Sequence, residues 1–299
     1  MGGAARKAGL AAILALLALP SSAPASGLGV HWERYLPDMP PVGGPQPHAV
    51  PGCRRAALTC IDREARHLAR IQRRYGCDHR GVFATTYLEL TRTLRAAVAT
   101  RSVRFADRRY LFFEDALFAD VYFNTLGAWS GGRPIAPAWR IALETARSGQ
   151  VNAAQDMLLG INAHVQNDMP FVVAALGLTR RDGRSRKPDH DVVNDVLDAA
   201  YQRVIDAVRR RFDPVLDFTN PSWTNGDDVA GLEMVRGWRE GVWRNAERLV
   251  AASDDAARAQ VADQIQQNAA AWAEAIAAAP QPGYRATRDA YCAGVLAGA

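Results

Sequence analysis

Apolar residues recur every three or four positions along most of the chain, and this spacing places them on one face of an α-helix. In residues 54–76, for example, Ile61 and Leu68 share such a face, and Gly76 follows as a stop signal. No segment shows the alternation of a β-strand over a useful length. The pattern predicts helices over eight segments: 54–76, 82–99, 108–129, 137–149, 151–177, 189–212, 229–252 and 254–279. We therefore expect an all-α fold, a single-domain bundle of about seven to nine helices over residues 53–299.

The first 52 residues depart from this helical pattern. Arg6 and Lys7 precede a short apolar run, and small residues typical of a cleavage site follow it, so residues 1–25 resemble a secretory signal peptide. Residues 26–52 are rich in proline and glycine, which predicts an extended arm. No later segment is long and apolar enough to span a membrane. We expect a secreted, extracytoplasmic protein with no transmembrane segment once the signal peptide is removed.

Composition and charge exclude little. The chain is 48% hydrophobic and 22% charged, which is typical of a globular protein that buries one sizeable core. Loss of the two basic residues of the signal peptide lowers the formal net charge from +5 to +3. This mild excess of positive charge argues neither for nor against a nucleic-acid partner, and the sequence contains no nucleic-acid-binding motif.

Four cysteines follow the predicted cleavage site, and an even number in an exported chain favours two disulfides. Four cysteines allow three connectivities. We expect Cys53–Cys60, which are close in sequence around a helix start. Cys77–Cys292 would then join the end of the first helix to the C-terminal tail.

The candidate chemistry begins at the run GINAHVQNDMP. His164 and Asp168 are four residues apart, so they share a helix face that is otherwise apolar. Gly160 on that face allows close approach of a neighbouring helix. Pro170 cannot donate a hydrogen bond to the carbonyl of Gln166, so we expect a kink beside Asp168.

Two other helices contribute polar residues to predicted inward faces. His190 and Asn194 are also four apart, and Asp189 just before them is a natural helix N-cap. Asp115 and Asp120 lie in a helix that is apolar almost all round. A buried carboxylate requires a compensating partner, and we place Asp115 nearest to the histidines.

Inward-facing His and Asp residues on one bundle match the oxygen and nitrogen ligands of a single zinc or manganese ion. Such an ion would lower the pKa of its bound water to about 7 and generate a hydroxide nucleophile. A basic loop joins the two helices that carry the histidines, and it offers a site for an anionic substrate. Its basic residues are Arg180, Arg181, Arg184, Arg186 and Lys187.

Two resemblances support these assignments. The N-A-H-x-x-x-D-x-P run at residues 162–170 and the D-H-x-x-V-N run at 189–194 resemble a family of helical bacterial and fungal proteins catalogued as a domain of unknown function, over most of residues 55–280. That resemblance implies a fold but no activity. The pair His164 and Asp168 is also similar to the buried H-x-x-x-D pair of the zinc-dependent phospholipase C and P1-type nuclease group. The chain departs from that group because Asn194 replaces a glutamate and the expected further histidines are absent, which favours one metal over three.

Two functional hypotheses follow. In the first, the protein is an exported metal-dependent hydrolase of phosphoester-like substrates. His164, Asp168 and His190 bind the metal, Asp115 binds or bridges it, and Asn194 orients water or substrate. In the second, the protein is a non-catalytic exported helical domain that binds a ligand or partner. The same residues then form a core hydrogen-bond network without a cofactor.

Overall fold

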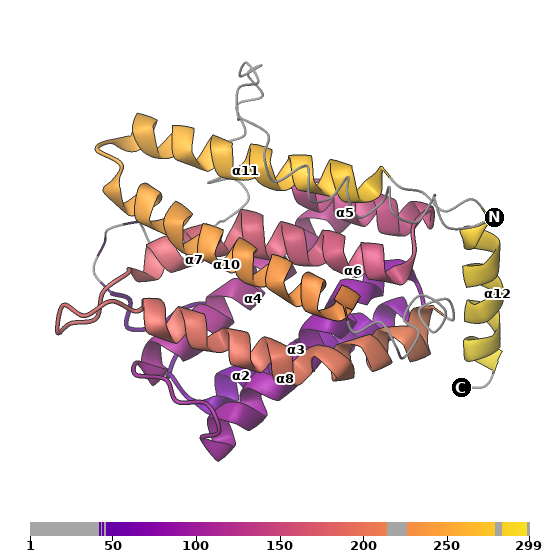
Figure 1. Cartoon of the computed structure of the whole chain (residues 1–299), viewed down its shortest axis with the longest axis horizontal. Coiled ribbons are helices and arrows are strands. Elements are labelled where there is room, and N and C mark those ends of the chain that lie inside the picture. The colour runs from indigo at the N-terminus through magenta and orange to yellow at the C-terminus, as the bar shows by residue number, and fades with distance from the viewer. Residues whose placement is uncertain (1–41, 43, 45, 214–225, 279–282, 298–299) are drawn as a thin grey trace. The chain divides into compact units, whose positions relative to one another are not determined.

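The computed structural model describes residues 42, 44, 46–213, 226–278 and 283–297, and over these residues it is an all-α domain without β-strands (Figure 1). The predicted all-α bundle is therefore confirmed. The predicted signal peptide and most of the predicted arm lie outside the described residues. None of the described helices is long and apolar enough to cross a membrane. The helices are α2 (Leu58–Tyr75), α3 (Val82–Thr100), α4 (Arg108–Ser130), α5 (Pro137–Ser148), α6 (Ala153–Asn162), α7 (Met169–Leu176), α8 (Lys187–Phe212), α10 (Gly226–Ala251), α11 (Asp255–Ala277) and α12 (Tyr284–Ala297).

Helices α6 and α7 form the centre of the bundle. Every residue of α7 is buried, because its sequence MPFVVAAL has no polar face. Figure 1 shows α11 above this central pair, α3 and α8 below it, and α10 crossing it diagonally. Helix α7 packs against α4 and α10, and α6 packs against α3, α5 and α11. Polar side chains on this central segment are consequently surrounded by protein.

A π-helical turn, Ala163–Asp168, joins α6 to α7 and contains the polar motif. In this turn the N–H of Met169 donates to the carbonyl of His164, five residues earlier. In a π turn the backbone N–H donates to the carbonyl five residues earlier, whereas in an α-helix it donates to the carbonyl four residues earlier. This wider turn lies just before Pro170, which has no N–H to donate. The break expected at Pro170 therefore takes the form of a π turn within a continuous helical segment. Such turns are frequent at functional sites.

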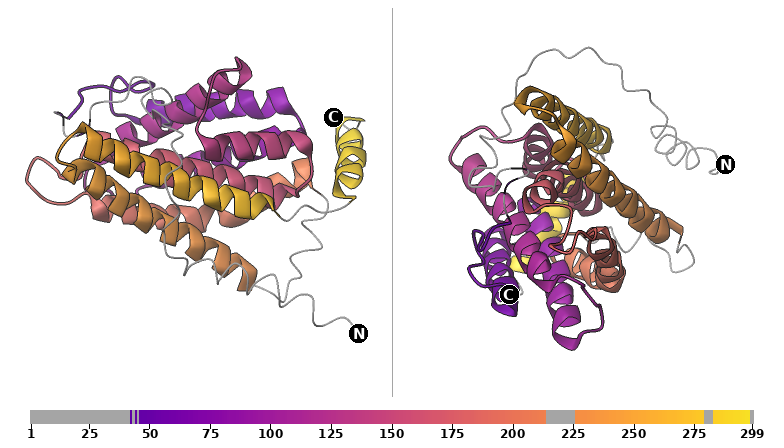
Figure 2. Two further views of the ribbon diagram at one scale, coloured as in Figure 1. Left: turned by 90° about the horizontal axis from the view of Figure 1, so that it is seen from above. Right: turned by 90° about the vertical axis from the view of Figure 1, so that its left-hand side faces the viewer.

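Both predicted disulfides are present, Cys53–Cys60 and Cys77–Cys292. The second tethers α12, a helix that the hydrophobic pattern did not indicate. This helix stands across the end of the bundle (Figure 2). It is also held by the hydroxyl of Tyr284, which donates to Asp213 over 2.5 Å.

The predicted N-cap role of Asp189 is wrong. Helix α8 begins at Lys187, so Asp189 lies in its first turn. Its carboxylate accepts hydrogen bonds from the backbone N–H groups of Ala106 (2.6 Å) and Asp107 (2.7 Å). Asp189 therefore fastens α8 to the start of α4, where Asp107 is the N-cap.

Candidate functional site

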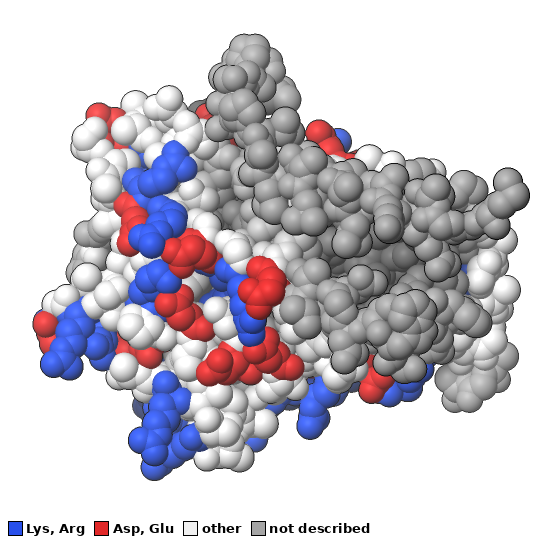
Figure 3. Space-filling model, in the orientation of Figure 1, with Lys and Arg blue, Asp and Glu red and all other residues white. Residues whose placement is uncertain are grey.

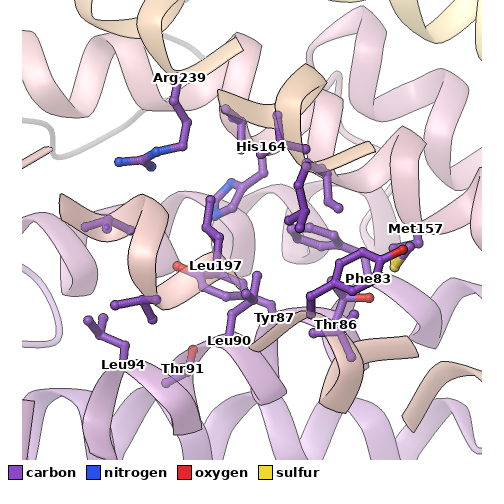
Figure 4. Close-up of a pocket in the computed structure, with 18 of the residues that line it drawn as sticks. Phe83, Thr86, Tyr87, Leu90, Thr91, Leu94, Met157, His164, Leu197 and Arg239 are labelled. Atoms are coloured by element: carbon purple, nitrogen blue, oxygen red, sulfur yellow. The ribbon is translucent and has the colours of Figure 1, made fainter. Parts of the chain in front are cut away.

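An apolar cavity of about 340 Å³ lies among α3, α4, α6, α8 and α10 (Figure 4). Most of its wall consists of Leu, Ile, Val and Met side chains. Each helix contributes at least one of them: Leu94 from α3, Leu111 from α4, Ile161 from α6, Leu197 from α8 and Val235 from α10. Ligand pockets in proteins are typically apolar and roughly 300–1,000 Å³ in volume, with a few polar groups on the wall. The polar groups on this wall therefore define the candidate site.

His164 is the first of these polar groups, and Asp168 orients it. Nδ1 of His164 lies 2.9 Å from Oδ2 of Asp168, and both side chains are almost fully buried. The same carboxylate accepts hydrogen bonds from Trp139 Nε1 (2.8 Å) and Asn167 Nδ2 (2.7 Å). Three donors thus converge on Asp168, which places the imidazole proton on Nδ1 and leaves Nε2 as an acceptor. Nε2 has no hydrogen-bond partner among the described residues, and His164 lines the cavity.

Aromatic rings enclose the imidazole. Phe118 stacks on it with ring centroids 3.5 Å apart, while the rings of Tyr87 and Phe83 lie at 5.1 and 5.5 Å. Burial lowers the pKa of His164, although Asp168 opposes this shift. The imidazole is consequently neutral near pH 7. Phe83 reaches this position because Gly160 has no side chain, since a Cβ there would lie 2.5 Å from the Phe83 ring.

Asp115 also lines the cavity, but its partner is Glu64, which sequence analysis missed. Burial raises the pKa of Asp115 to about 6, and burial together with the Asp115 charge raises the pKa of Glu64 well above its usual value. Oε1 of Glu64 accepts a hydrogen bond from Thr91 (2.7 Å), whereas Oε2 of Glu64 and Oδ2 of Asp115 have no described donor. The two acids therefore share a proton. Glu64 was predictable, because it lies between Ile61 and Leu68 on the apolar face of α2.

His190 and Asn194 hold α10 against α8 through Arg239. Nε2 of His190 lies 3.0 Å from the carbonyl oxygen of Arg239, and Nε of Arg239 donates to Oδ1 of Asn194 (2.9 Å). Arg239 also donates to the carbonyl of His190. Arg239 is only 4% exposed and lines the cavity, and nothing in the sequence distinguished it from the many other arginines.

The four predicted metal ligands are engaged by different partners. His164 binds Asp168, Asp115 binds Glu64, and His190 binds the backbone of α10. Within the described ranges, no group of three or more His, Cys, Asp and Glu side chains is arranged to hold a metal ion. The assignment of these four side chains as metal ligands stays a prediction.

Much of the basic loop is engaged in structural contacts. Arg186 is 3% exposed and donates to the carbonyls of Leu176 (3.2 Å) and Gly177 (2.9 Å) at the end of α7. Lys187 forms ion pairs with Asp191 and Glu240. Figure 3 shows basic and acidic side chains interspersed over one face of the molecule.

The fold and site define an all-α protein with an apolar cavity and buried polar groups on the cavity wall. A family model described as a family of unknown function (DUF5995) matches residues 61–279, and the chain belongs to this family. The comparisons found no curated protein and no solved structure that matches the chain.

Proposed function

We propose that the protein is a non-catalytic exported domain that binds an apolar small molecule in the cavity. The observation that carries this proposal is His164 itself, a buried residue of the cavity wall whose Nε2 has no hydrogen-bond partner among the described residues, on a wall made mainly of aliphatic side chains. A buried acceptor without a partner costs roughly 1–3 kcal/mol. A ligand that brings a hydroxyl or amine donor would recover that cost, while its apolar part displaces water from the aliphatic wall.

The test fills the cavity and measures binding of a neutral fluorescent probe, N-phenyl-1-naphthylamine. Leu197→Phe places additional volume in the cavity, and Val250→Phe on the 38% exposed position of α10 is the matched control. We expect wild type and the control to bind the probe, aliphatic alcohols to displace it, and the filled variant to lose binding. Absence of probe binding by the wild type, or equal binding by the folded filled variant, would contradict the proposal.

A hydrolase remains the second candidate because of the geometry of His164 and Asp168. An imidazole held by a carboxylate, with its second nitrogen free, is the arrangement of a general base that activates water. This candidate needs an ester whose acyl or phosphoryl group enters the cavity. Turnover of p-nitrophenyl butyrate or p-nitrophenyl phosphate by the wild type, lost in His164→Gln, would favour it. The binding proposal expects no turnover by either protein.

A further inference from the structure

We propose, on the basis of the proposed binding function, that the ligand is an aliphatic carboxylic acid whose carboxylate is held by Arg239. The apolar chain of the acid would lie along the cavity, and the guanidinium would bind its head group. Nothing in the fold assignment requires this ligand class. The proposed ligand class follows from the position of the buried Arg239 guanidinium on the aliphatic wall of the cavity.

The guanidinium of Arg239 has unused capacity to donate. Its Nε and Nη2 atoms donate to Asn194 and to the backbone of His190, as described above. The only described acceptor for Nη1 is the thioether sulfur of Met169, at 3.6 Å, and a thioether is a weak acceptor. Among the described residues, no carboxylate forms an ion pair with Arg239. A carboxylate ligand would replace the thioether contact with a charge-assisted hydrogen bond.

The remainder of the wall selects an aliphatic chain. Figure 4 shows Arg239 and His164 extending from one side of the cavity, with Leu90 and Leu94 of α3 facing them from the other. Val193 and Leu197 of α8 continue this aliphatic surface. The aromatic rings described above cluster instead around His164. A flexible chain leaving Arg239 therefore meets mainly methyl and methylene groups.

A carboxylate ligand would share the cavity with two acids, Asp115 and Glu114. Of these two, Glu114 is the one whose charge acts on Arg239. It lines the cavity, is 5% exposed, and lies 3.8 Å from Nδ1 of His190. Its negative charge favours the charged form of Arg239 but would repel a bound carboxylate. We therefore expect opposite effects on carboxylate binding for the two neutralising substitutions, Arg239→Gln and Glu114→Gln.

The experiment compares dodecanoate with its uncharged methyl ester by displacement of the same neutral probe at pH 8. The ester fills the cavity equally but presents no charge to Arg239. We expect wild type to bind the acid at least about tenfold more tightly than the ester, the ratio that one charge-assisted hydrogen bond supplies. Arg239→Gln should remove this preference, and Glu114→Gln should increase it. Arg244→Gln, which removes an exposed arginine of the same helix, should leave it unchanged.

The outcomes separate this inference from the binding function on which it rests. Equal binding of acid and ester by the wild type would overturn the assignment of the carboxylate to Arg239 while leaving apolar binding intact. Binding of neither compound, and of no probe, would overturn the binding function itself. If Arg239→Gln does not fold, the wild-type ratio and the Glu114→Gln variant still decide, because loss of preference in Glu114→Gln would contradict the inference.

Discussion

At the scale of single residues, buried polar groups distinguish this protein from a simple apolar bundle. Asp168 is a central one of them, because it accepts from His164, Trp139 and Asn167. Its removal would leave three donors unsatisfied in a site that excludes water. An unsatisfied buried donor costs more than the hydrogen bond itself contributed.

Asp168→Ala should therefore lower the free energy of unfolding by at least about 2–3 kcal/mol, as measured by urea denaturation. Glu144→Ala is the control, because that residue forms only an exposed ion pair with Arg140 at 3.8 Å. The control should change stability by less than about 0.5 kcal/mol. Equal effects of the two substitutions would mean that the Asp168 network contributes little.

The Glu64 and Asp115 pair predicts a pH dependence of stability. Because both folded-state pKa values are raised, with Asp115 at about 6, the folded protein holds protons that the unfolded chain releases. Stability therefore falls as pH rises from about 4 through the folded-state pKa values, which means through about 6 for Asp115 and onward to the raised pKa of Glu64. In Glu64→Gln the amide supplies the donor to Asp115 permanently and still accepts from Thr91.

We expect Glu64→Gln to be more stable than wild type at pH 8, by at least about 1 kcal/mol, with the difference shrinking as pH falls to 4. Urea denaturation at a series of pH values measures this difference. A variant less stable than wild type at pH 8, or a difference that does not depend on pH, would show that the two acids do not share a proton.

At the scale of secondary structure, the hydrophobic period predicted most helices because long one-sided patterns dominate local folding. The hydrophobic period did not predict features that depend on tertiary contacts or on a disulfide. The Cys77–Cys292 disulfide and Tyr284 hold in place α12, the helix that the pattern did not indicate. Asp189 resembled a cap, but tertiary contacts to Ala106 and Asp107 take its carboxylate. The partners of His164 and His190 depend on which helices adjoin, and a single sequence does not specify that.

The contact between Gly160 of α6 and the Phe83 ring of α3 brings these two helices close together beside the cavity. Gly160→Ala introduces a Cβ within 2.5–2.7 Å of three Phe83 atoms, and overpacking of this kind costs roughly 1–3 kcal/mol. Gly237→Ala on α10 is the matched control, because a Cβ there meets nothing within 4 Å. The control should be neutral or stabilising, since alanine favours helix. Thermal denaturation of the two variants provides the comparison, and a Gly160→Ala variant as stable as the control would contradict the close packing.

At the scale of the whole molecule, the two disulfides constrain very different lengths of chain. Cys53 and Cys60 are separated by 7 residues, whereas Cys77 and Cys292 are separated by 215. In the chain-entropy account, a disulfide that closes a longer loop removes more freedom from the unfolded state. The Cys77–Cys292 disulfide should consequently contribute more to stability.

Replacing both Cys77 and Cys292 by serine should lower the free energy of unfolding by about 2–5 kcal/mol, more than the same replacement of Cys53 and Cys60. Urea denaturation of the two double variants under non-reducing conditions measures the difference. A larger loss for the short loop would show that local packing outweighs chain entropy here.

The most direct test of the central claim is a crystal structure of the protein soaked with a bromine-labelled aliphatic alcohol. The bromine gives an anomalous signal that locates the ligand independently of interpretation. We predict a peak inside the cavity bounded by Leu94, Leu197 and Val235, with the hydroxyl within hydrogen-bond distance of Nε2 of His164. A cavity that stays free of bromine while the alcohol is bound elsewhere, or is not bound at all, would contradict the account.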